Sequence, residues 1–452
     1  MAAKKTSRAA RKANRARTAD GLLVSVYTPT DNAKYLKECY KSLRAQRYKN
    51  WEWILVTNGE LLKSSTIPKQ IRDDEAVRIC SYPFPSRGIG ALKGYAIQQC
   101  QGQLYVELDH DDILTPDALE EIVCAYNKTN AGFFYSDFVT FREDKTSVTY
   151  PAEVGWESYA VKRGATSYQA SRAFLPSAAS IHRLIFCPNH IRAWSKEGYE
   201  AAGGYDSEFM VCDDFDLITR TYLAGVEFHY IDKCLYFYRN WEGSRSLAHN
   251  QDIQKIEGDL AHTRAHDIAR EHCRRRGLLA VEVGFGPDLI PPSDFTDIED
   301  DSLGWVRVKD VIQYIPAGYV VEWMTTVWRK LAHESWLALS VPSTDGPGGF
   351  QNPTYSSFWN LHSFYYFTDD WYSSQLVGGF SGNFHLARCW DDYPDEFLES
   401  RKILYANADL IALKDDNARV AGVPLPKKKK RRRTKDGSKR PNAAVGDRSL
   451  RR

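Results

Sequence analysis

The chain has 452 residues, of which 43% are hydrophobic and 26% charged, and this length suffices for two domains that each bury a core. No apolar run approaches the roughly 18–20 residues of a membrane-spanning helix, and the basic N-terminus lacks the apolar stretch of a secretion signal. These features argue against a membrane span and predict a cytoplasmic protein. The nine cysteines show no C-x-x-C spacing, so they predict core thiols in a reducing compartment and no structural zinc.

The formal net charge of +2 conceals an uneven distribution. Residues 1–18 hold seven Lys or Arg and no acid, and residues 424–452 hold thirteen against two acids, so the body is strongly acidic. Both ends are poor in apolar residues, which predicts basic disordered tails over 1–20 and 416–452. Tails of this kind bind nucleic acid, another polyanion or an import receptor, or only keep a protein soluble, and the sequence leaves these alternatives open.

An apolar run ending in Thr-Pro-Thr opens the ordered chain at residues 21–30, and the pattern of a helix and the strand WEWILVTNG follow. Strand, helix and strand in this order predict an α/β fold with a parallel sheet. Ligands of such sheets bind at the carboxyl ends of the strands. We therefore expect Thr28 to Asp31, Asn58 and Asp109 to Asp112 to meet in one cleft.

The remaining chain is organised around residues 103–122, QLYVELDHDDILTPDALEEI. A predicted strand ends at Asp109-His110-Asp111-Asp112, and a helix is predicted from Thr115 as N-cap and Pro116 as first helical residue. Three carboxylates in four positions repel one another, so a positive partner is expected. A divalent cation that carries a diphosphate has the matching oxygen-ligand chemistry. The alternative is a solvated acidic turn.

The preceding segment, SRGIGALKGYAIQQCQG, has glycines that allow the backbone to approach a phosphate, and Lys93 offers positive charge. Glycines at such spacing open many ordinary helices. The segment also lacks the position and the following acid of a dinucleotide fingerprint.

Four motifs in this order resemble the family 2 glycosyltransferases, which have the nucleotide-sugar-binding GT-A fold. They are VSVYTPTDNAKYLKECYKSLRAQRYKNWEWILVTNG, IGALKGYAIQQCQGQLYVELDHDD, GGYDSEFMVCDDFDLITRTYLAG and IDKCLYFYR. The resemblance covers about residues 21–256. It implies that these residues form a glycosyltransferase domain of the hexosyltransferase class, with a mixed and mainly parallel sheet.

The resemblance implies a role for each matching residue. Asp111 would bind Mn2+ or Mg2+, with Asp109 nearer the ribose or a metal-bound water and Asp112 a second-choice ligand. The family's third metal ligand is often a His after the Tyr-Arg strand; Trp241 stands at that place, which leaves His249 or His229 as a substitute. The donor would contact Thr28, Pro29, Asn58, Lys93 and Asp109. Many members have an Asp where Asn58 stands, so the donor is left open as UDP- or GDP-linked.

The segment VCDDFDL, residues 211–217, supplies a second group of acids. An inverting transfer needs one base for the proton of the acceptor hydroxyl. Aligned on the family's Glu-Asp pattern, Asp213 takes the Glu place and Asp214 that of the base, while Asp216 caps or braces the helix. The alternative is that all three are ordinary acids of a helix N-terminus.

The segment from Tyr135 to Trp194 is rich in aromatic residues and arginine and is expected to form the acceptor side. Trp156, His190, Arg192 and Trp194 are the candidates for stacking on a sugar or fixing a hydroxyl, or they are core residues. The acceptor class itself, whether protein, glycan, lipid or DNA, is not readable.

A polar helical run follows and predicts a connector over 257–280. Residues 281–415 are then expected to form a smaller α/β domain, whose part from about 295 to 413 resembles the later half of a class I S-adenosylmethionine-dependent methyltransferase. Only VEVGFGPDL precedes that part, too short for the glycine-rich turn and ribose-binding acid that this family needs. We interpret a truncated, degenerate methyltransferase-like domain.

The sequence thus predicts a metal-dependent inverting glycosyltransferase, with no membrane span, in the cytoplasm of a bacterium or, for a viral enzyme, of its host. One alternative is a bifunctional enzyme that also methylates with S-adenosylmethionine. Another is a non-catalytic protein whose basic tails bind nucleic acid.

Overall fold

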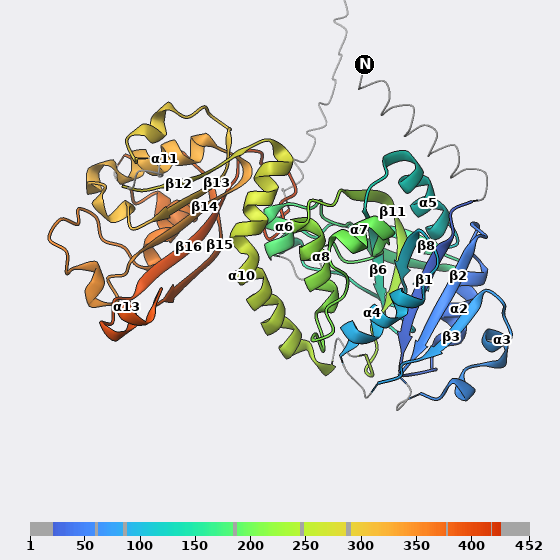
Figure 1. Ribbon diagram of the computed structural model, residues 1–452. Coiled ribbons are helices and arrows are strands. Elements are labelled where there is room, and N and C mark those ends of the chain that lie inside the picture. The colour runs from blue at the N-terminus through green and yellow to red at the C-terminus, as the bar shows by residue number, and fades with distance from the viewer. Residues whose placement is uncertain are drawn as a thin grey trace, which may run out of the picture.

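The computed structural model describes residues 21–425 except 59–61, 85–87, 184–187, 245–247, 286–290, 377 and 417. The predicted tails over 1–20 and beyond 425 lie outside the described residues. Two sheets stand on either side of one long helix, α10 (Asn250–Arg276), as Figure 1 shows. No helix in the described ranges is long and apolar enough to cross a membrane.

The first sheet is mixed. Along its main path β3, β2, β1 and β4 run parallel, β10 is antiparallel to both β4 and β6, β11 is parallel to β6, and β5 closes the path antiparallel to β11. In path order the strands are β3 (Val77–Ser81), β2 (Trp51–Thr57), β1 (Val24–Thr30), β4 (Leu104–Glu107), β10 (Ala193–Ser195), β6 (Phe133–Phe141), β11 (Phe228–Arg239) and β5 (Ile113–Leu114). The α/β class and the mainly parallel first half agree with the sequence prediction.

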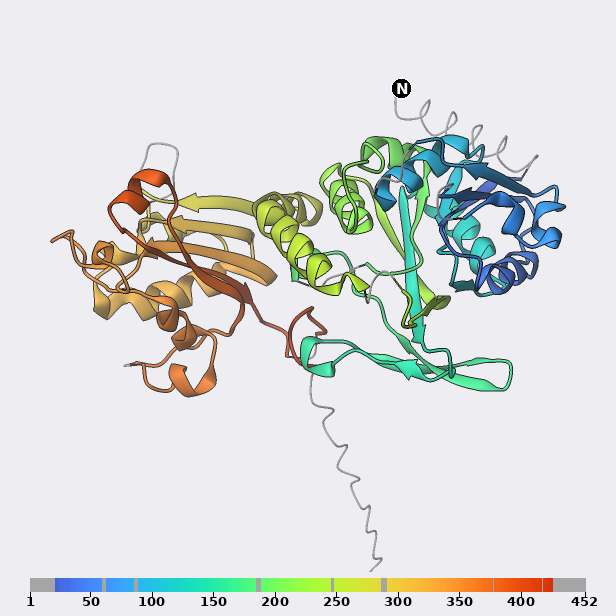
Figure 2. The ribbon, with the colours of Figure 1, turned by 90° about the horizontal axis from the view of Figure 1, so that it is seen from below.

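Three further strands extend this sheet from β6. They are β7 (Ser147–Val148), β8 (Ser158–Arg163) and β9 (Thr166–Ser171). The hairpin of β8 and β9 extends away from the body of the sheet in Figure 2.

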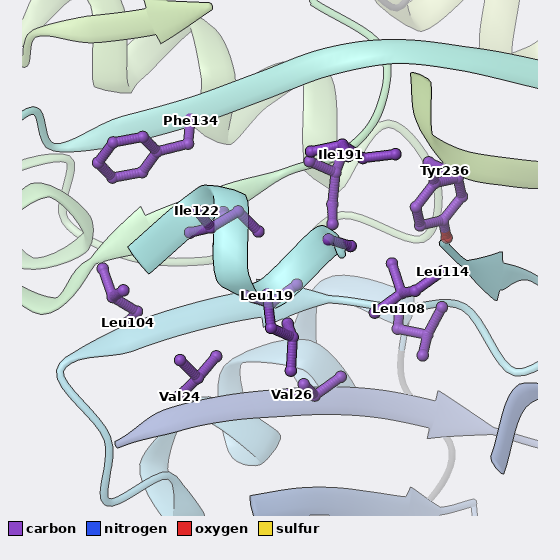
Figure 3. Close-up of a cluster of buried hydrophobic side chains, with 14 of the residues drawn as sticks. Val24, Val26, Leu104, Leu108, Leu114, Leu119, Ile122, Phe134, Ile191 and Tyr236 are labelled. Carbon is purple, nitrogen blue, oxygen red and sulfur yellow. The ribbon is translucent and has the colours of Figure 1, made fainter. Parts of the chain in front are cut away.

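Apolar alternation along the strands builds the core of the first domain. Val24 and Val26 of β1 and Leu104 of β4 face Leu119 and Ile122 of α5 (Ala118–Thr129), and all are buried (Figure 3). The predicted strand–helix–strand unit is present as β1, α2 (Leu36–Arg44) and β2. The other helices of this domain are α3 (Lys69–Arg72), α4 (Ile89–Gln99), α6 (Ala178–Arg183), α7 (Lys196–Ala201) and α8 (Asp213–Leu223).

The predicted start of α5 is wrong. Ile113 and Leu114 form β5 against β11 instead of continuing toward a helix, and Asp117, not Thr115, stands at the N-cap. The Thr115 hydroxyl donates to the Asp117 carboxylate (2.7 Å). Pairing with β11, a strand more than a hundred residues away, therefore overrides the local Thr-Pro signal. It also makes Asp109–Asp112 a closed turn between two strands.

The second sheet has the order β12-β13-β14-β16-β15, with the first three strands parallel and the last two antiparallel to their neighbours. Its strands are β12 (Leu279–Val283), β13 (Leu303–Lys309), β14 (Leu331–Pro342), β15 (Phe384–Asp392) and β16 (Tyr405–Ala412), with helices α11 (Val320–Lys330), α12 (Asp370–Ser373) and α13 (Glu396–Ser400). VEVGFGPDL lies partly outside the described residues.

Helix α10 joins the two domains through an apolar cluster. Its buried residues, which include Ala265 and Ile268, pack with Tyr222 of α8 on one side and with Trp305 and Trp336 of the second sheet on the other. The helix begins at residue 250, before the predicted connector over 257–280, so its first turns belong to the first domain.

The end of the described chain returns to the first domain. Residues 418–425, which we call the strap, pack beside β9 and the segment that precedes β8 (Figure 2). The Arg419 guanidinium donates to the carbonyls of Arg172 (2.9 Å) and Ala173 and lies over the Phe174 ring, 4.2 Å from its centre. The backbone of Gly422 and Leu425 bonds to Val154 and Ala152. The ordered chain therefore continues beyond residue 416, where the tail was predicted to begin.

Arg419→Ala is expected to lower the free energy of unfolding by about 1–3 kcal/mol, because it leaves two carbonyls without their charged donor. Urea unfolding measures this difference. The matched control is Arg401→Ala, because Arg401 stacks on the exposed ring of Phe397 and its removal should change stability by less than about 0.5 kcal/mol. Equal effects of the two substitutions would show that the strap does not hold the domains together.

Candidate active site

A cavity of about 230 Å³ lies at the carboxyl ends of β1 and β4, as the sheet topology predicts. Three segments supply most of its polar walls: the end of β1, the acidic turn after β4, and the N-terminus of α8. Its polar and charged lining includes Thr30, Asp31, Asn32, Lys93, Asp109, His110, Asp111, Asn189, His190, Arg192, Asp213, Asp214 and Ser244.

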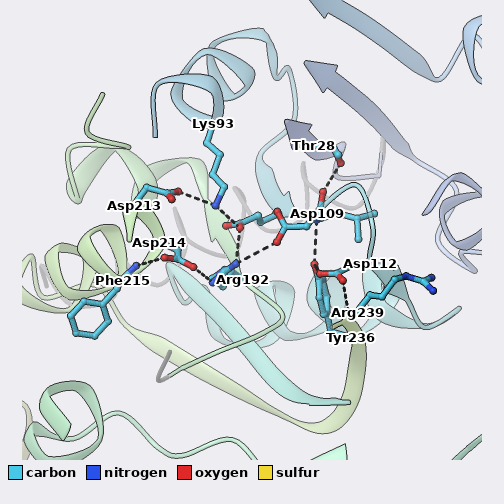
Figure 4. A network of polar contacts seen from close by, with 12 residues as sticks. Thr28, Lys93, Asp109, Asp112, Arg192, Asp213, Asp214, Phe215, Tyr236 and Arg239 are labelled. Atoms are coloured by element: carbon cyan, nitrogen blue, oxygen red, sulfur yellow. Dashed lines mark hydrogen bonds and ion pairs between the residues drawn. The ribbon is translucent and has the colours of Figure 1, made fainter. Parts of the chain in front are cut away.

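A buried charge network underlies the cavity (Figure 4). Glu107, the last residue of β4, contacts Lys93 Nζ at 2.9 Å and Arg192 Nη2 at 2.8 Å. Lys93 also reaches Asp213 (2.9 Å), and Arg192 Nη1 reaches Asp214 (2.5 Å). The two cations thus connect the strand that leads to the acidic turn with the first residues of α8.

The network holds Glu107 ionised. Burial favours the neutral acid, but the charges of Arg192 and Lys93 outweigh it and hold the pKa of Glu107 well below its ordinary value. Burial likewise opposes the charge of Lys93, and Asp213 and Glu107 raise the pKa of its ammonium above the ordinary value. The Tyr205 hydroxyl adds a hydrogen bond to Glu107 (2.8 Å).

The three carboxylates of the acidic turn have different surroundings. Asp112 is buried and accepts hydrogen bonds from the Tyr236 hydroxyl (2.7 Å) and the Arg239 backbone N–H (2.6 Å), so it fixes the turn to β11. Burial, together with Asp111 and Asp109, raises its pKa well above the ordinary value. Asp111 accepts from the Trp241 indole N–H (2.7 Å), and Asp109 lies 3.9 Å from Arg192. Asp109 and Asp111, not Asp112, line the cavity.

The fit to a divalent cation rests on Asp109 and Asp111. Within the described ranges no three or more His, Cys, Asp or Glu side chains are placed to hold a metal by themselves. Proteins hold Mg2+ through one or two carboxylates plus the phosphates of the substrate, and Asp109 and Asp111 are two carboxylates in the cavity lining. His249 does not line the cavity; its imidazole is about half exposed and lies 3.8 Å from Asp252, at the start of α10. The structure therefore does not bring His249 to the carboxylates.

Asp213 and Asp214 open α8. The Asp214 Oδ1 atom accepts from the Phe215 N–H (2.8 Å) and its Oδ2 atom from Arg192, which orients the carboxylate. The side chain of Asp214 is 13% exposed and that of Asp213 4%, so Asp214 is the more accessible of the two. Burial raises the pKa of Asp213 to about 6, against the charge of Lys93. Asp216 points elsewhere and accepts from Arg264 of α10 (2.6 Å), which braces the two helices.

The predicted donor residues divide into two groups. Pro29 and Lys93 line the cavity together with Asp109. Thr28 is fully buried, donates to the Leu108 carbonyl (2.6 Å) and accepts from the Trp53 indole (2.8 Å), so it links β1 to β2 and to the residue after β4. Asn58 is buried after β2 and its backbone N–H bonds to Thr30 (2.9 Å), outside the cavity lining.

The predicted acceptor residues are mostly explained by packing. Trp156 lies in the core against Phe138 and Phe174, and Trp194 is fully buried with its indole bonded to Thr221 (3.1 Å). Neither lines the cavity. His190 does, and it stacks on Tyr236 with ring centres 4.2 Å apart. Arg192 lies at the centre of the charge network rather than on a separate acceptor surface.

Sequence reasoning missed Glu107 and Tyr205, and it placed Trp241 at the position of a metal-binding His without foreseeing its bond to Asp111. Glu107 had one signal, since it is the single charged residue in the apolar run LYVEL, where burial demands a partner. Tyr205 gave no local signal, because its partner lies 98 residues away in sequence.

Residues 25–185 match the family model "Glycosyl transferase family 2". Over these residues the chain is similar to family 2 glycosyltransferase domains, as the motifs implied.

Several curated proteins are similar to part of this chain. An uncharacterized glycosyltransferase of Rickettsia typhi is 35% identical over 107 residues, 24% of this chain and 32% of that protein. Chondroitin synthase of Escherichia coli is 26% identical over 236 residues, 52% of this chain and 31% of that protein, and glycosyltransferase GlyG of Streptococcus pneumoniae is 24% identical over 255 residues, 54% and 76%. The chain spans about a third of the length of the first two.

Among solved structures, TarS of S. aureus, crystallised in complex with UDP-GlcNAc, overlaps with a TM-score of 0.42 at 15% identity, over 56% of this chain and 73% of that one. An overlap of this size assigns no ligand to the present cavity.

Proposed function

We propose that this protein transfers a sugar from a nucleotide diphosphate to an acceptor hydroxyl with inversion at the anomeric carbon, on a GT-A fold. The observation that carries the proposal is one cavity with two carboxylate groups: Asp109 and Asp111 on one wall, and Asp214 on another, joined through Arg192. One group suits the leaving diphosphate and the other suits the attacking hydroxyl.

The charge balance at the donor end supports metal dependence. Among the described lining residues, the cations Lys93 and Arg192 each already contact two carboxylates within 3 Å. The negative charge of a diphosphate therefore needs a further cation. Mn2+ or Mg2+, held by Asp111 with Asp109 beside it, would supply Lewis-acid stabilisation of the departing diphosphate.

Asp214 is the proposed general base. Its carboxylate, oriented by Arg192 and the Phe215 N–H, takes the proton of the acceptor hydroxyl. The hydroxyl oxygen forms the new bond to the anomeric carbon, and the bond from that carbon to the diphosphate oxygen breaks in the same displacement. The nucleoside diphosphate leaves with the electron pair, and Asp214 holds the proton.

The second domain is proposed to be a structural or acceptor-presenting module. The cluster around α10 and the strap support this role, since both attach it to the first domain. Its methyltransferase-like origin and the function of the basic tails stay predictions from the sequence.

The test is binding of a panel of nucleotide sugars with and without Mn2+, in wild type and Asp111→Ala. We expect one donor to bind tightly only with the metal. Asp111→Ala should weaken that binding by at least about 10-fold, because the substitution removes a group that holds the metal. The control is Glu200→Ala, an exposed acid on α7 whose loss should leave the affinity unchanged. Metal-independent binding, or no binding to any donor, would refute the proposed role of the acidic turn.

A further inference from the structure

Glu257 of α10 is a buried acid that the proposed reaction does not use. It is 1% exposed, and both of its carboxylate oxygens lack a hydrogen-bond partner among the described residues. An ionised carboxylate in such a place strongly destabilises the fold. Glu257 is therefore either kept neutral or kept for a functional role.

The position of Glu257 relates it to the proposed base. One turn earlier on the same helix, Ile253 lines the cavity. The Cys212 thiol, which directly precedes Asp213 and Asp214, donates to the Ile253 carbonyl (3.6 Å). Helix α10 therefore packs against the start of α8, and Glu257 lies next to the wall that carries Asp214.

The neighbouring charges leave no cation for Glu257. The charges that act on it are those of Asp214 from α8 and of Arg192, the residue before β10. Arg192 already contacts Glu107 and Asp214, and Lys93 contacts Glu107 and Asp213. A further negative charge would compete with Asp214 for the same guanidinium. Burial, and next the charge of Asp214, raise the pKa of Glu257 to about 9.

We propose that Glu257 is a positioning residue for the transfer, a neutral carboxylic acid that packs beside the Asp214–Arg192 pair and leaves Arg192 bound to the base. The inference rests on the proposed function of Asp214. Ionisation of Glu257 at alkaline pH would draw Arg192 away from Asp214, so turnover would fall while donor binding at Asp109 and Asp111 stayed.

The test compares pH profiles of wild type and Glu257→Gln, because glutamine keeps the size and neutrality of the acid but cannot ionise. We expect the wild-type kcat to fall about tenfold for each pH unit above about 9, and this alkaline limb to be absent in Glu257→Gln. The kcat at pH 7 and the donor Kd should agree within about twofold between the two proteins. Asp259→Asn, an exposed acid on the same helix, should keep the wild-type profile.

Unfolding provides a second readout that needs no activity. Because the folded pKa of Glu257 lies above its unfolded value of about 4.5, its contribution to stability is full below that pH and is lost as the pH rises toward 9. Glu257→Gln should therefore gain stability relative to wild type from about pH 5 to pH 9. Should this variant not fold, Glu257→Met, also neutral, takes its place.

The outcomes separate the two proposals. An alkaline limb that persists in Glu257→Gln, or a stability difference that does not change with pH, overturns the role of Glu257. A wild type that binds no donor refutes the proposed function instead, and the pH dependence of stability then decides alone whether Glu257 is held as the neutral acid.

Discussion

Arg192→Met is expected to lower the free energy of unfolding by about 3–5 kcal/mol, because it removes one partner of buried ion pairs. Arg192 is fully buried and contacts Glu107, Asp214 and, more distantly, Asp109. Methionine fills a similar volume but removes the guanidinium from all three carboxylates, and only Glu107 of the three keeps an ion pair with Lys93 among the described contacts. Chemical denaturation at pH 7 measures the difference.

The control for this substitution is Arg329→Met. Arg329 and Asp300 are each about half exposed and lie 3.3 Å apart, so this pair should contribute less than about 1 kcal/mol. A loss for Arg192→Met no larger than that of Arg329→Met would show that the network does not hold the site.

The stability loss caused by Arg192→Met should become smaller at acid pH. The depressed pKa of Glu107 contributes stability that is present above the ordinary pKa of a glutamate and is lost as pH falls through the folded value. Arg192→Met removes much of that contribution. The difference in the free energy of unfolding between wild type and Arg192→Met should therefore become smaller as the pH falls below about 4.

Asp214→Asn is expected to lower kcat by about 10²–10⁴-fold while the affinity for the donor stays within a factor of about two, as loss of a general base does. Asparagine keeps an oxygen for the Phe215 N–H but cannot accept the proton of the acceptor hydroxyl. Steady-state kinetics with the donor that the binding panel identifies, together with a direct measurement of donor Kd, separates the two effects.

The comparison variant is Asp213→Asn. Asp213 is less exposed than Asp214 and is held by Lys93, so its loss should act through the network, with a smaller fall in kcat and a measurable fall in stability. If the two variants lose kcat equally, the base cannot be assigned to Asp214 on these grounds. If Asp213→Asn loses more, the two roles are exchanged.

Local patterns in the sequence were sufficient for the frame of the first domain. The apolar run ending at Thr30, the helix after it and the strand WEWILVT predict a parallel unit. The apolar run ending at Glu107 adds a further parallel strand and places Asp109 and Asp111 at the carboxyl edge of the sheet. Asp213 and Asp214 follow from the same kind of information, since three acids in the first turn of a helix are visible in the sequence. The periodicity that predicts these elements extends over a few residues and needs no distant partner.

The roles of side chains within that frame depend on distant partners. Trp156 and Trp194 have the chemistry of a sugar platform and also that of a core residue, and only packing against Phe138, Phe174 and Thr221 decides between them. Thr115 carries a strong N-cap signal that strand pairing with β11 overrides.

The sequence by itself determined which carboxylates meet at one edge of the sheet, because strand direction and helix N-termini are local properties. Only the tertiary structure decided which cation forms an ion pair with which carboxylate. Lys93 and Arg192 lie 14 and 85 residues from Glu107, and Glu257 stands in a polar helix that gives no sign of burial. The physical reason is that the cost of a buried charge depends on every neighbour that the fold brings to it, and those neighbours come from all parts of the chain.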